Sequence, residues 1–257
     1  MYYAGIDLGS ITAKAVIIGN GQILASTITF SGYNSAETAR RVLTEALEKA
    51  GLTPDDVARL VATGYGRIRV PAADKQITEI TCHARGAYWL HPETRTIIDV
   101  GGQDSKGIAL NDHGKVVDFV MNDKCAAGTG RFLEVMAHAL EEDLDRFGEL
   151  SLVAPRRAQI SSTCTVFAES EVISQIAGGV PKNVIIAGIH EAIAARISGM
   201  VQRITVRDQV VMTGGVARNA GVAQMLEEKL SHRVLVLPEA QITGAIGAAL
   251  IAQELDG

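Results

Sequence analysis

The strongest constraint on the fold is an internal repeat. The pattern Asp-x-Gly, followed by four residues and then Lys, occurs at Asp7–Lys14 and again at Asp99–Lys106, an offset of 92 residues. A weaker similarity relates Thr63-Gly64 to Thr213-Gly214. Because a duplicated sequence folds into duplicated structural units, this repeat bears on the architecture before any local pattern does. We expect two similar α/β halves whose strand ends build a cleft between them.

Alternating apolar and polar residues predict three strands at the start of each half, and helices alternate with strands after that. The expected strands are Tyr2–Leu8, Thr12–Ile18, Gln22–Thr29, Leu60–Thr63, Thr96–Val100, Lys106–Leu110, Lys115–Met121, Gln209–Met212 and Val234–Leu237. The expected helices are Ala36–Ala50, Gln76–Ala87, Gly130–Leu140, Val166–Ile176, Val184–Ile204, Asn219–Leu230 and Gly244–Leu255, with a further helix start at Thr53–Asp56.

The repeat also suggests a division into domains. Residues 1–92 form the first expected half, and residues 93–240 form the second. The last helix, within residues 241–257, is expected to pack back on the first half. No linker or low-complexity stretch separates the two halves.

Composition excludes several classes of partner. The net charge is -5 and the isoelectric point is near 5.7, with no basic stretch, so nucleic acid and anionic membrane surfaces are not expected partners. The N-terminus lacks a cationic segment followed by an apolar one, and charged residues interrupt the most apolar stretch, residues 184–201. A cytoplasmic protein without a membrane span is therefore expected. Three cysteines, an odd number, argue against a disulfide framework.

Each Asp-x-Gly lies where one predicted strand turns into the next. Backbone N–H groups at such a turn can hold an anion, and a nearby carboxylate can hold a divalent cation. Phosphoryl transfer to water also needs an oriented nucleophile. Asp99, Gln103 or Asp104 could orient the water or a Mg²⁺ ion. The first loop supplies Asp7, Ser10, Thr12 and Lys14, and the second supplies Asp99, Gly101, Gly102, Gln103 and Asp104.

A third glycine segment follows the predicted strand near Val210–Thr213. Gly214 and Gly215 leave room there for a flat ring such as adenine, and Gln241–Gly247 opens the last helix with similarly small residues. A single glycine pair is more often only a tight turn. Three ordered segments in a duplicated chain favour a nucleotide site instead. They resemble the two phosphate segments and the adenosine segment of the superfamily of actin, sugar kinases and heat-shock chaperone ATPases.

Two of the three cysteines precede predicted helices. Cys125 and Cys164 lie where free N–H groups and the helix dipole favour a thiolate, the form that binds metal. An iron-sulfur cluster ligated by cysteine alone needs four thiolates. One chain with three cysteines cannot complete such a cluster, whereas two identical chains that each supply two thiolates can. The general alternative for any cysteine is a small buried hydrophobe. We keep that interpretation for Cys82, and we interpret His83 beside it as an ordinary helix residue.

The resemblance becomes specific in five segments. They are Ala62–Arg67, Asp74–Gln76, Ile98–Asp104, Asn122–Leu133 and Ser161–Glu171. Together they resemble the activator component of 2-hydroxyglutaryl-CoA dehydratase, in the family that also holds the ATPase subunits of benzoyl-CoA reductase. The match extends from Gly5 to Leu250.

This resemblance implies a duplicated ribonuclease H-like, actin-like ATPase fold, with two mixed sheets and helices around a nucleotide cleft between the domains. It implies a homodimer with one 4Fe-4S cluster bridged by Cys125 and Cys164 of both chains, and ATP or ADP with Mg²⁺. A ferredoxin or flavodoxin would supply an electron, and a 2-hydroxyacyl-CoA dehydratase or related iron-sulfur reductase would receive it. The implied nucleotide positions are Ser10, Thr12, Ala13, Lys14, Gln103, Asp104, Gly214, Gly215, Asn219 and Gln241.

One departure from the family pattern concerns the first loop. Ile11 separates Ser10 from Thr12, whereas the family often has Ser-Thr directly after the loop glycine. Either hydroxyl can therefore be the leading phosphate contact.

Two other functions fit the superfamily. A small-molecule kinase is the enzymatic alternative, although 257 residues leave no evident insertion for an acceptor pocket. A filament-forming scaffold is the non-enzymatic alternative, and it gives no role to Cys125 or Cys164.

Overall fold

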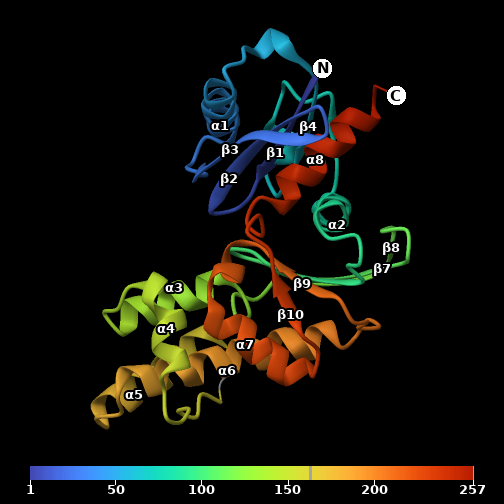
Figure 1. Cartoon of the computed structure of the whole chain (residues 1–257). Helices are drawn as coiled ribbons and strands as arrows, with labels where there is room; N and C mark the ends of the chain where they lie inside the picture. The colour runs from blue at the N-terminus through green and yellow to red at the C-terminus, as the bar shows by residue number, and fades with distance from the viewer. Residues whose placement is uncertain (162–163, 257) are drawn as a thin grey trace. The chain divides into compact units, whose positions relative to one another are not determined.

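The computed structural model describes residues 1–161 and 164–256. The chain divides into two compact units, each built from strands and helices (Figure 1). Unit 1 comprises Met1–Ile97, Leu110–Val117 and Pro238–Gly257, and unit 2 comprises Ile98–Ala109 and Asp118–Leu237. The strands belong to two five-stranded sheets, as the sequence repeat predicts.

The first sheet has the strand order β3-β2-β1-β4-β5. Its three predicted leading strands are confirmed, and β1 pairs antiparallel with β2 but parallel with β4, so the sheet is mixed. The register places Asp7 directly opposite Lys14. The strands are β1 (Tyr2–Leu8), β2 (Thr12–Gly19), β3 (Gln22–Phe30), β4 (Val57–Thr63) and β5 (Lys75–Gln76).

Helices cover both faces of the first sheet. On one face lies α1 (Ser35–Ala50), which begins at the Asn34 cap and ends at Gly51 in the left-handed conformation that glycine adopts readily. On the other face lies α8 (Thr243–Glu254), and α2 (Glu79–Leu90) packs against α8. Apolar side chains fill both layers, so unit 1 has a core on each side of its sheet.

Two local predictions in unit 1 were wrong. The predicted helix Gln76–Ala87 starts late, because Lys75–Gln76 pairs with β4 and the Thr78 side chain caps α2 by accepting from the Thr81 N–H. The helix start at Thr53–Asp56 gives only a single 3₁₀ turn, Pro54–Asp56, before β4 begins.

The second sheet has the order β10-β9-β6-β7-β8. This order places the strand that precedes the third glycine segment, β9, directly beside the strand that precedes the second glycine loop, β6. The predicted strands are all confirmed. They are β6 (Thr96–Val100), β7 (Ser105–Leu110), β8 (Val116–Asn122), β9 (Val210–Thr213) and β10 (Val234–Val236).

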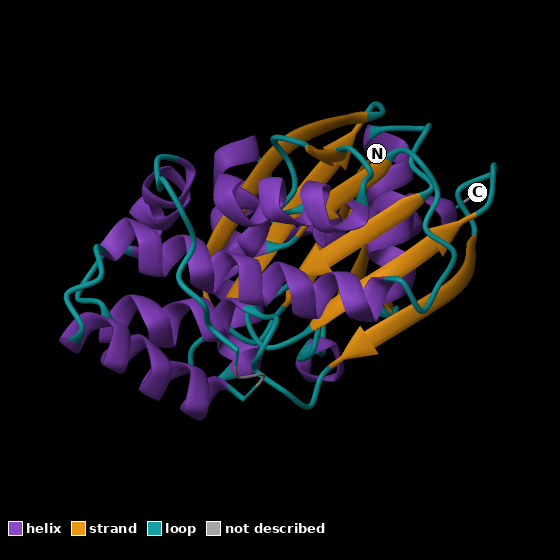
Figure 2. Cartoon of the chain, turned by 90° about the horizontal axis from the view of Figure 1, so that it is seen from below, coloured by secondary structure: helices purple, strands orange, loops and turns teal. Residues whose placement is uncertain are grey.

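Within the described residues, unit 2 contains five α-helices. Figure 2 shows the helices and strands of the chain in separate colours. The five helices are α3 (Gly130–Ala139), α4 (Phe147–Leu152), α5 (Thr165–Ala177), α6 (Lys182–Val201) and α7 (Ala220–Leu230). All were predicted except the short α4. Among the described residues, α6 is the one helix long and apolar enough to cross a membrane, and 67% of that stretch is buried within the fold.

Candidate functional site

The first glycine loop, residues 9–11, joins β1 to β2. Asp7 and Lys14 face each other across these strands, and the Lys14 ammonium lies 3.1 Å from the Asp7 carboxylate. The Gly9 N–H donates to the Thr12 carbonyl at 3.1 Å, and the Ser31 hydroxyl donates to the Gly9 carbonyl at 2.6 Å. Hydrogen bonds to Thr12 and from Ser31 thus fix the loop at Gly9. Ser10 and Ala13 lie close to Asp7 and Lys14 in the sequence.

The second glycine loop contains a buried lysine between two carboxylates. Lys106, with only 2% of its side chain exposed, lies 3.1 Å from Asp99 and 2.6 Å from Asp104. The Thr213 hydroxyl donates to the other Asp99 oxygen at 2.9 Å. The Gly101 N–H donates to the Asp104 carbonyl, which closes the turn. The sequence repeat indicated that Lys106 belongs to the site, but it did not predict that the lysine is buried between two carboxylates.

Within that closed turn, Gly102 is half-buried and Gln103 is exposed. The Gln103 amide therefore has access to solvent and to a ligand, whereas the Asp99 carboxylate is almost fully buried. The three candidates for orienting a water molecule thus have different surroundings, because the Asp104 side chain is half-buried.

The third glycine segment approaches the second loop within unit 2. Gly214 has a φ of 88°, a left-handed conformation that favours glycine, and a Cβ there would collide with the Val100 carbonyl. The end of β9 therefore lies against the end of β6. Gly215 begins a 3₁₀ turn, Gly215–Arg218, that leads to α7.

Asn219 fixes the start of α7. Its side-chain oxygen accepts from the Val222 N–H at 3.2 Å, and its amide nitrogen lies 3.1 Å from His190 Nε2. An amide nitrogen only donates, so Nε2 is the acceptor and His190 is neutral. Burial lowers the pKa of His190 to about 3, in keeping with that state. The apolar pattern of α6 does not indicate that His190 supports this segment.

Gln241 lies in unit 1, in the turn that precedes α8. It is half-buried. The residues after it, beginning with Thr243 and Gly244, form the buried start of that helix.

The Cys125 segment is a loop between β8 and α3 that is closed by hydrogen bonds. The Asn122 side chain accepts from the Cys125 N–H at 3.2 Å and donates to the Cys125 carbonyl at 2.8 Å. The Thr129 hydroxyl donates to the Ala126 carbonyl at 2.6 Å. The Cys125 side chain is half-buried and so remains reachable.

Cys164 is the N-cap residue of α5 and is exposed. Glu171, about two turns further into the helix, accepts from both the N–H and the hydroxyl of Ser161 at 2.7 Å. Residues 162 and 163 lie outside the described part of the chain. Cys164 therefore lies at the start of a helix, as expected, whereas Cys125 lies in the loop five residues before the first residue of α3.

Cys82 differs from the other two cysteines. It is fully buried in α2, and this burial raises the pKa of its thiol to about 12. The thiol stays protonated at neutral pH, so the interpretation of Cys82 as a buried hydrophobe is confirmed.

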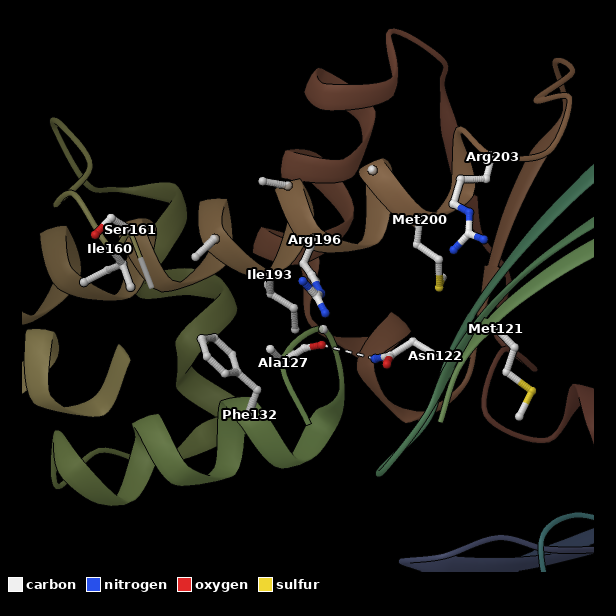
Figure 3. A pocket seen from close by; sticks show the side chains of 14 residues that line it. Met121, Asn122, Ala127, Phe132, Ile160, Ser161, Ile193, Arg196, Met200 and Arg203 are labelled. Atoms are coloured by element: carbon white, nitrogen blue, oxygen red, sulfur yellow. Dashed lines mark hydrogen bonds between the residues drawn. The ribbon is translucent and has the colours of Figure 1, made fainter. Parts of the chain in front are cut away.

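The two accessible cysteine segments border one open hollow of about 590 Å³ in unit 2. Asn122 and Ala127 line it from the Cys125 segment, and Ile160 and Ser161 line it from the Cys164 segment (Figure 3). The helices that follow the two segments, α3 and α5, also pack against each other. Arg196 of α6 lies at the same hollow. Within residues 1–161 and 164–256, no group of three or more His, Cys, Asp or Glu side chains gathers to hold a metal ion.

Comparison with solved structures defines the class of protein first. A ROK family glucokinase from Streptomyces griseus is 14% identical, covers 99% of this chain and 100% of its own, and has a TM-score of 0.61, which shows a shared fold. The two mixed sheets thus have the actin-like ATPase and sugar kinase fold, and the prediction of fold class is confirmed.

The family follows from a closer match. The family model described as the BadF/BadG/BcrA/BcrD ATPase family matches residues 4–252, and this chain belongs to that family.

Two relatives match along nearly the whole chain. The "Activator of lactoyl-CoA dehydratase" of Anaerotignum propionicum is 54% identical over 99% of this chain and 98% of its own. The solved structure of the activator of 2-hydroxyisocaproyl-CoA dehydratase from Clostridium difficile, with bound ADPNP, is 48% identical. It covers 99% of this chain and 95% of its own, with a TM-score of 0.96.

Proposed function

We propose that this chain is an ATP-dependent reductive activator. Two copies share one 4Fe-4S cluster, and ATP hydrolysis drives a low-potential electron from it to a 2-hydroxyacyl-CoA dehydratase or a related iron-sulfur CoA-ester reductase. The names of the similar proteins support this proposal, because both are activators of such dehydratases. The observation that carries it is that both thiols are accessible and that neighbouring residues of their two segments line the same hollow, although the cysteines themselves do not line it.

The donor set fits half of a cluster. Cys164 is a reachable thiol at the start of α5, where the helix dipole favours the thiolate, and Cys125 is a reachable thiol in the loop before α3. A cluster with cysteine ligands takes four thiolates. Two from each of two identical chains related by a two-fold axis complete the set, so the proposed protein is a homodimer. When bound, the cluster supplies one-electron transfer at a low potential.

The glycine loops are proposed to hold ATP or ADP. In the first, Ser10, Thr12, Ala13 and Lys14 contact phosphate, and the Asp7 carboxylate faces Mg²⁺. In the second, the Gly102 N–H contacts phosphate, and Gly101, whose N–H donates to the Asp104 carbonyl, shapes the turn that presents it.

Two polar side chains of the second loop are proposed to act on the attacking water. Gln103 is exposed, so its amide can orient the water. Asp104 accepts from Lys106, which holds its carboxylate in the loop, and this carboxylate would act on Mg²⁺ or the water. Asp99 accepts hydrogen bonds from Lys106 and Thr213, and it helps to hold the Lys106 ammonium in place beside Asp104.

The adenosine moiety is proposed to bind at Gly214 and Gly215, whose lack of side chains leaves space for a flat ring. Asn219 keeps that turn in place, because its oxygen caps α7 and its nitrogen binds His190. Gln241 contributes a polar side chain from the turn before α8.

The proposed partners follow from this role. A ferredoxin or flavodoxin reduces the cluster, and the dehydratase accepts the electron. Electron transfer in a reducing compartment agrees with a cytoplasmic location and with three unpaired thiols.

The alternatives receive less support. Similarity to the sugar kinase is limited to the fold at 14% identity, so it gives no support to a kinase activity. The hypothesis of a filament-forming scaffold assigns no role to Cys125 or Cys164. Sedimentation with ATP separates a scaffold, which forms polymers, from an activator, which stays a dimer.

An activation assay tests the proposal. With ATP, Mg²⁺ and a chemical reductant under anaerobic conditions, the protein should activate lactoyl-CoA dehydratase. The Cys164→Ser variant should lose activation but keep ATP hydrolysis, because Cys164 is exposed and remote in sequence from the glycine loops. The Gln103→Ala variant should lose most ATP hydrolysis, about 100-fold if the amide orients the attacking water. Activation without ATP, or by Cys164→Ser, would contradict the proposal.

A further inference from the structure

The N-terminus of α3 is bonded to the second glycine loop. Gly130 and Arg131, the first two residues of the helix, donate their N–H groups to the carbonyls of Gly101 and Gly102, both at 2.8 Å. The first N–H groups of a helix have no partner within the helix. Here the side chain of the Thr129 cap residue accepts no N–H group of the helix, and the glycine loop provides the acceptors instead.

The same helix start is bonded to the Cys125 segment on its other side. The N–H and the hydroxyl of Thr129 both donate to the Ala126 carbonyl, at 3.0 and 2.6 Å. Ala126 directly follows Cys125, whose backbone is fixed by Asn122. A continuous chain of short hydrogen bonds and peptide bonds therefore runs from the glycine loop to Cys125.

Gly130 is the residue at which these contacts meet. A Cβ at this position would lie 3.2 Å from the Gly101 carbonyl oxygen, 3.3 Å from Gly102 Cα and 3.4 Å from Val216 Cγ2. Val216 directly follows Gly214 and Gly215. Gly130 thus touches the second glycine loop and the third glycine segment at once, and the absence of its side chain allows both to approach.

We propose that Gly130 is a positioning residue that couples the nucleotide loop to the cysteine segment. A change in the Gly101–Gly102 backbone on nucleotide binding moves the first turn of α3 through two direct hydrogen bonds, and the Cys125 segment moves with it. The inference rests on the proposed function, because that assigns nucleotide to the loop and the cluster to Cys125. Coupling of this kind requires that nucleotide prefer one of two arrangements of the segment.

The test uses Gly130→Ala in the full-length protein, purified anaerobically. Gly130 is the first residue of α3, and alanine adopts a helical backbone at least as readily as glycine, so the variant should fold. Its methyl group pushes the loop away from α3 by a few tenths of an ångström. The matched control is Gly199→Ala in α6, which lines the hollow near the cysteine segments but where a Cβ meets nothing within 4 Å.

Two quantities are measured for each protein: the affinity for a non-hydrolysable ATP analogue, and the rate at which a chelator removes iron with and without that analogue. The wild type and Gly199→Ala should show a change in iron removal of about 5-fold or more, the lower range of allosteric coupling. Gly130→Ala should lose most of this response and keep nucleotide affinity within about 3-fold, as expected for a residue that carries coupling without contacting the ligand.

The outcomes separate the inference from the function on which it rests. If the wild type holds no iron or binds no nucleotide, the proposed function fails. If the wild type responds and Gly130→Ala responds equally, the coupling inference alone fails. Hydrogen exchange of the wild type gives a second test that needs no variant: nucleotide must change exchange at Gly130 and Arg131, and unchanged exchange there overturns the inference.

Discussion

Lys14 and Lys106 occupy equivalent positions in the sequence repeat but differ in burial. Lys14 has one carboxylate partner and is 12% exposed, whereas Lys106 has two partners and is 2% exposed. Removing one member of a buried ion pair leaves an uncompensated charge, which typically costs about 3–5 kcal/mol. The repeat alone could not distinguish the two lysines, because exposure depends on the packing around each sheet.

We therefore predict that Lys106→Met lowers the free energy of unfolding by about 3–5 kcal/mol, more than Lys14→Met does. Urea unfolding followed by circular dichroism measures both. Equal losses in the two variants would contradict the argument from burial.

His190 predicts a dependence of stability on pH. Its pKa is about 3 in the folded chain, because burial disfavours the charged ring, and about 6.5 when unfolded. Between these values the unfolded chain binds a proton that the folded chain does not. Stability is therefore full above pH 6.5 and falls as the pH drops through that window, by about 2 kcal/mol at pH 5.

The matched measurement compares the wild type with His190→Gln, which does not titrate. Urea unfolding at pH 5, 6 and 7 should show a smaller loss of stability in the variant as the pH falls. Parallel pH profiles for the two proteins would show that His190 is not the group responsible.

At the element scale, α2 and α8 cross at two glycines. A Cβ at Gly247 would collide with the Cys82 carbonyl, and one at Gly86 would collide with the Thr243 carbonyl. The backbones approach so closely that no side chain fits between them. This contact places α8 and α2 together on one face of the first sheet.

We predict that Gly247→Ala destabilises the protein by about 1–3 kcal/mol, the usual range for overpacking, despite the better helix propensity of alanine. Gly199→Ala, in open space on α6, should be neutral or stabilising by up to about 1 kcal/mol. Thermal unfolding of both variants checks this, and a Gly247→Ala protein as stable as Gly199→Ala would exclude the close crossing.

Elements with strong periodicity were predictable from the sequence, and short ones were not. The alternating strands of both sheets and the capped helix α1 follow local rules, so the sequence predicts them well. The two-residue strand β5 exists only because β4 offers a parallel edge, and α4 spans too few turns to show a pattern. Such elements depend on tertiary contacts that no local window contains.

At the scale of the whole molecule, the duplication predicted two sheets with an Asp-x-Gly at the end of a strand in each. The position of Cys164 at a helix start was also predictable, because caps are local signals, whereas the turn that separates Cys125 from α3 was not. The convergence of both segments at one hollow was not, since it depends on the packing of α3 against α5. The bonds between α3 and the second glycine loop were equally invisible in the sequence.

The central claim is that two chains complete one cluster, and a joint measurement of iron content and native mass tests it most directly. Anaerobically purified protein should be a dimer with about four iron atoms, or about two per chain. Cys125→Ser and Cys164→Ser should lose the iron, and Cys82→Ala should retain it. An iron-free monomer, or four iron atoms on each single chain, would contradict the account.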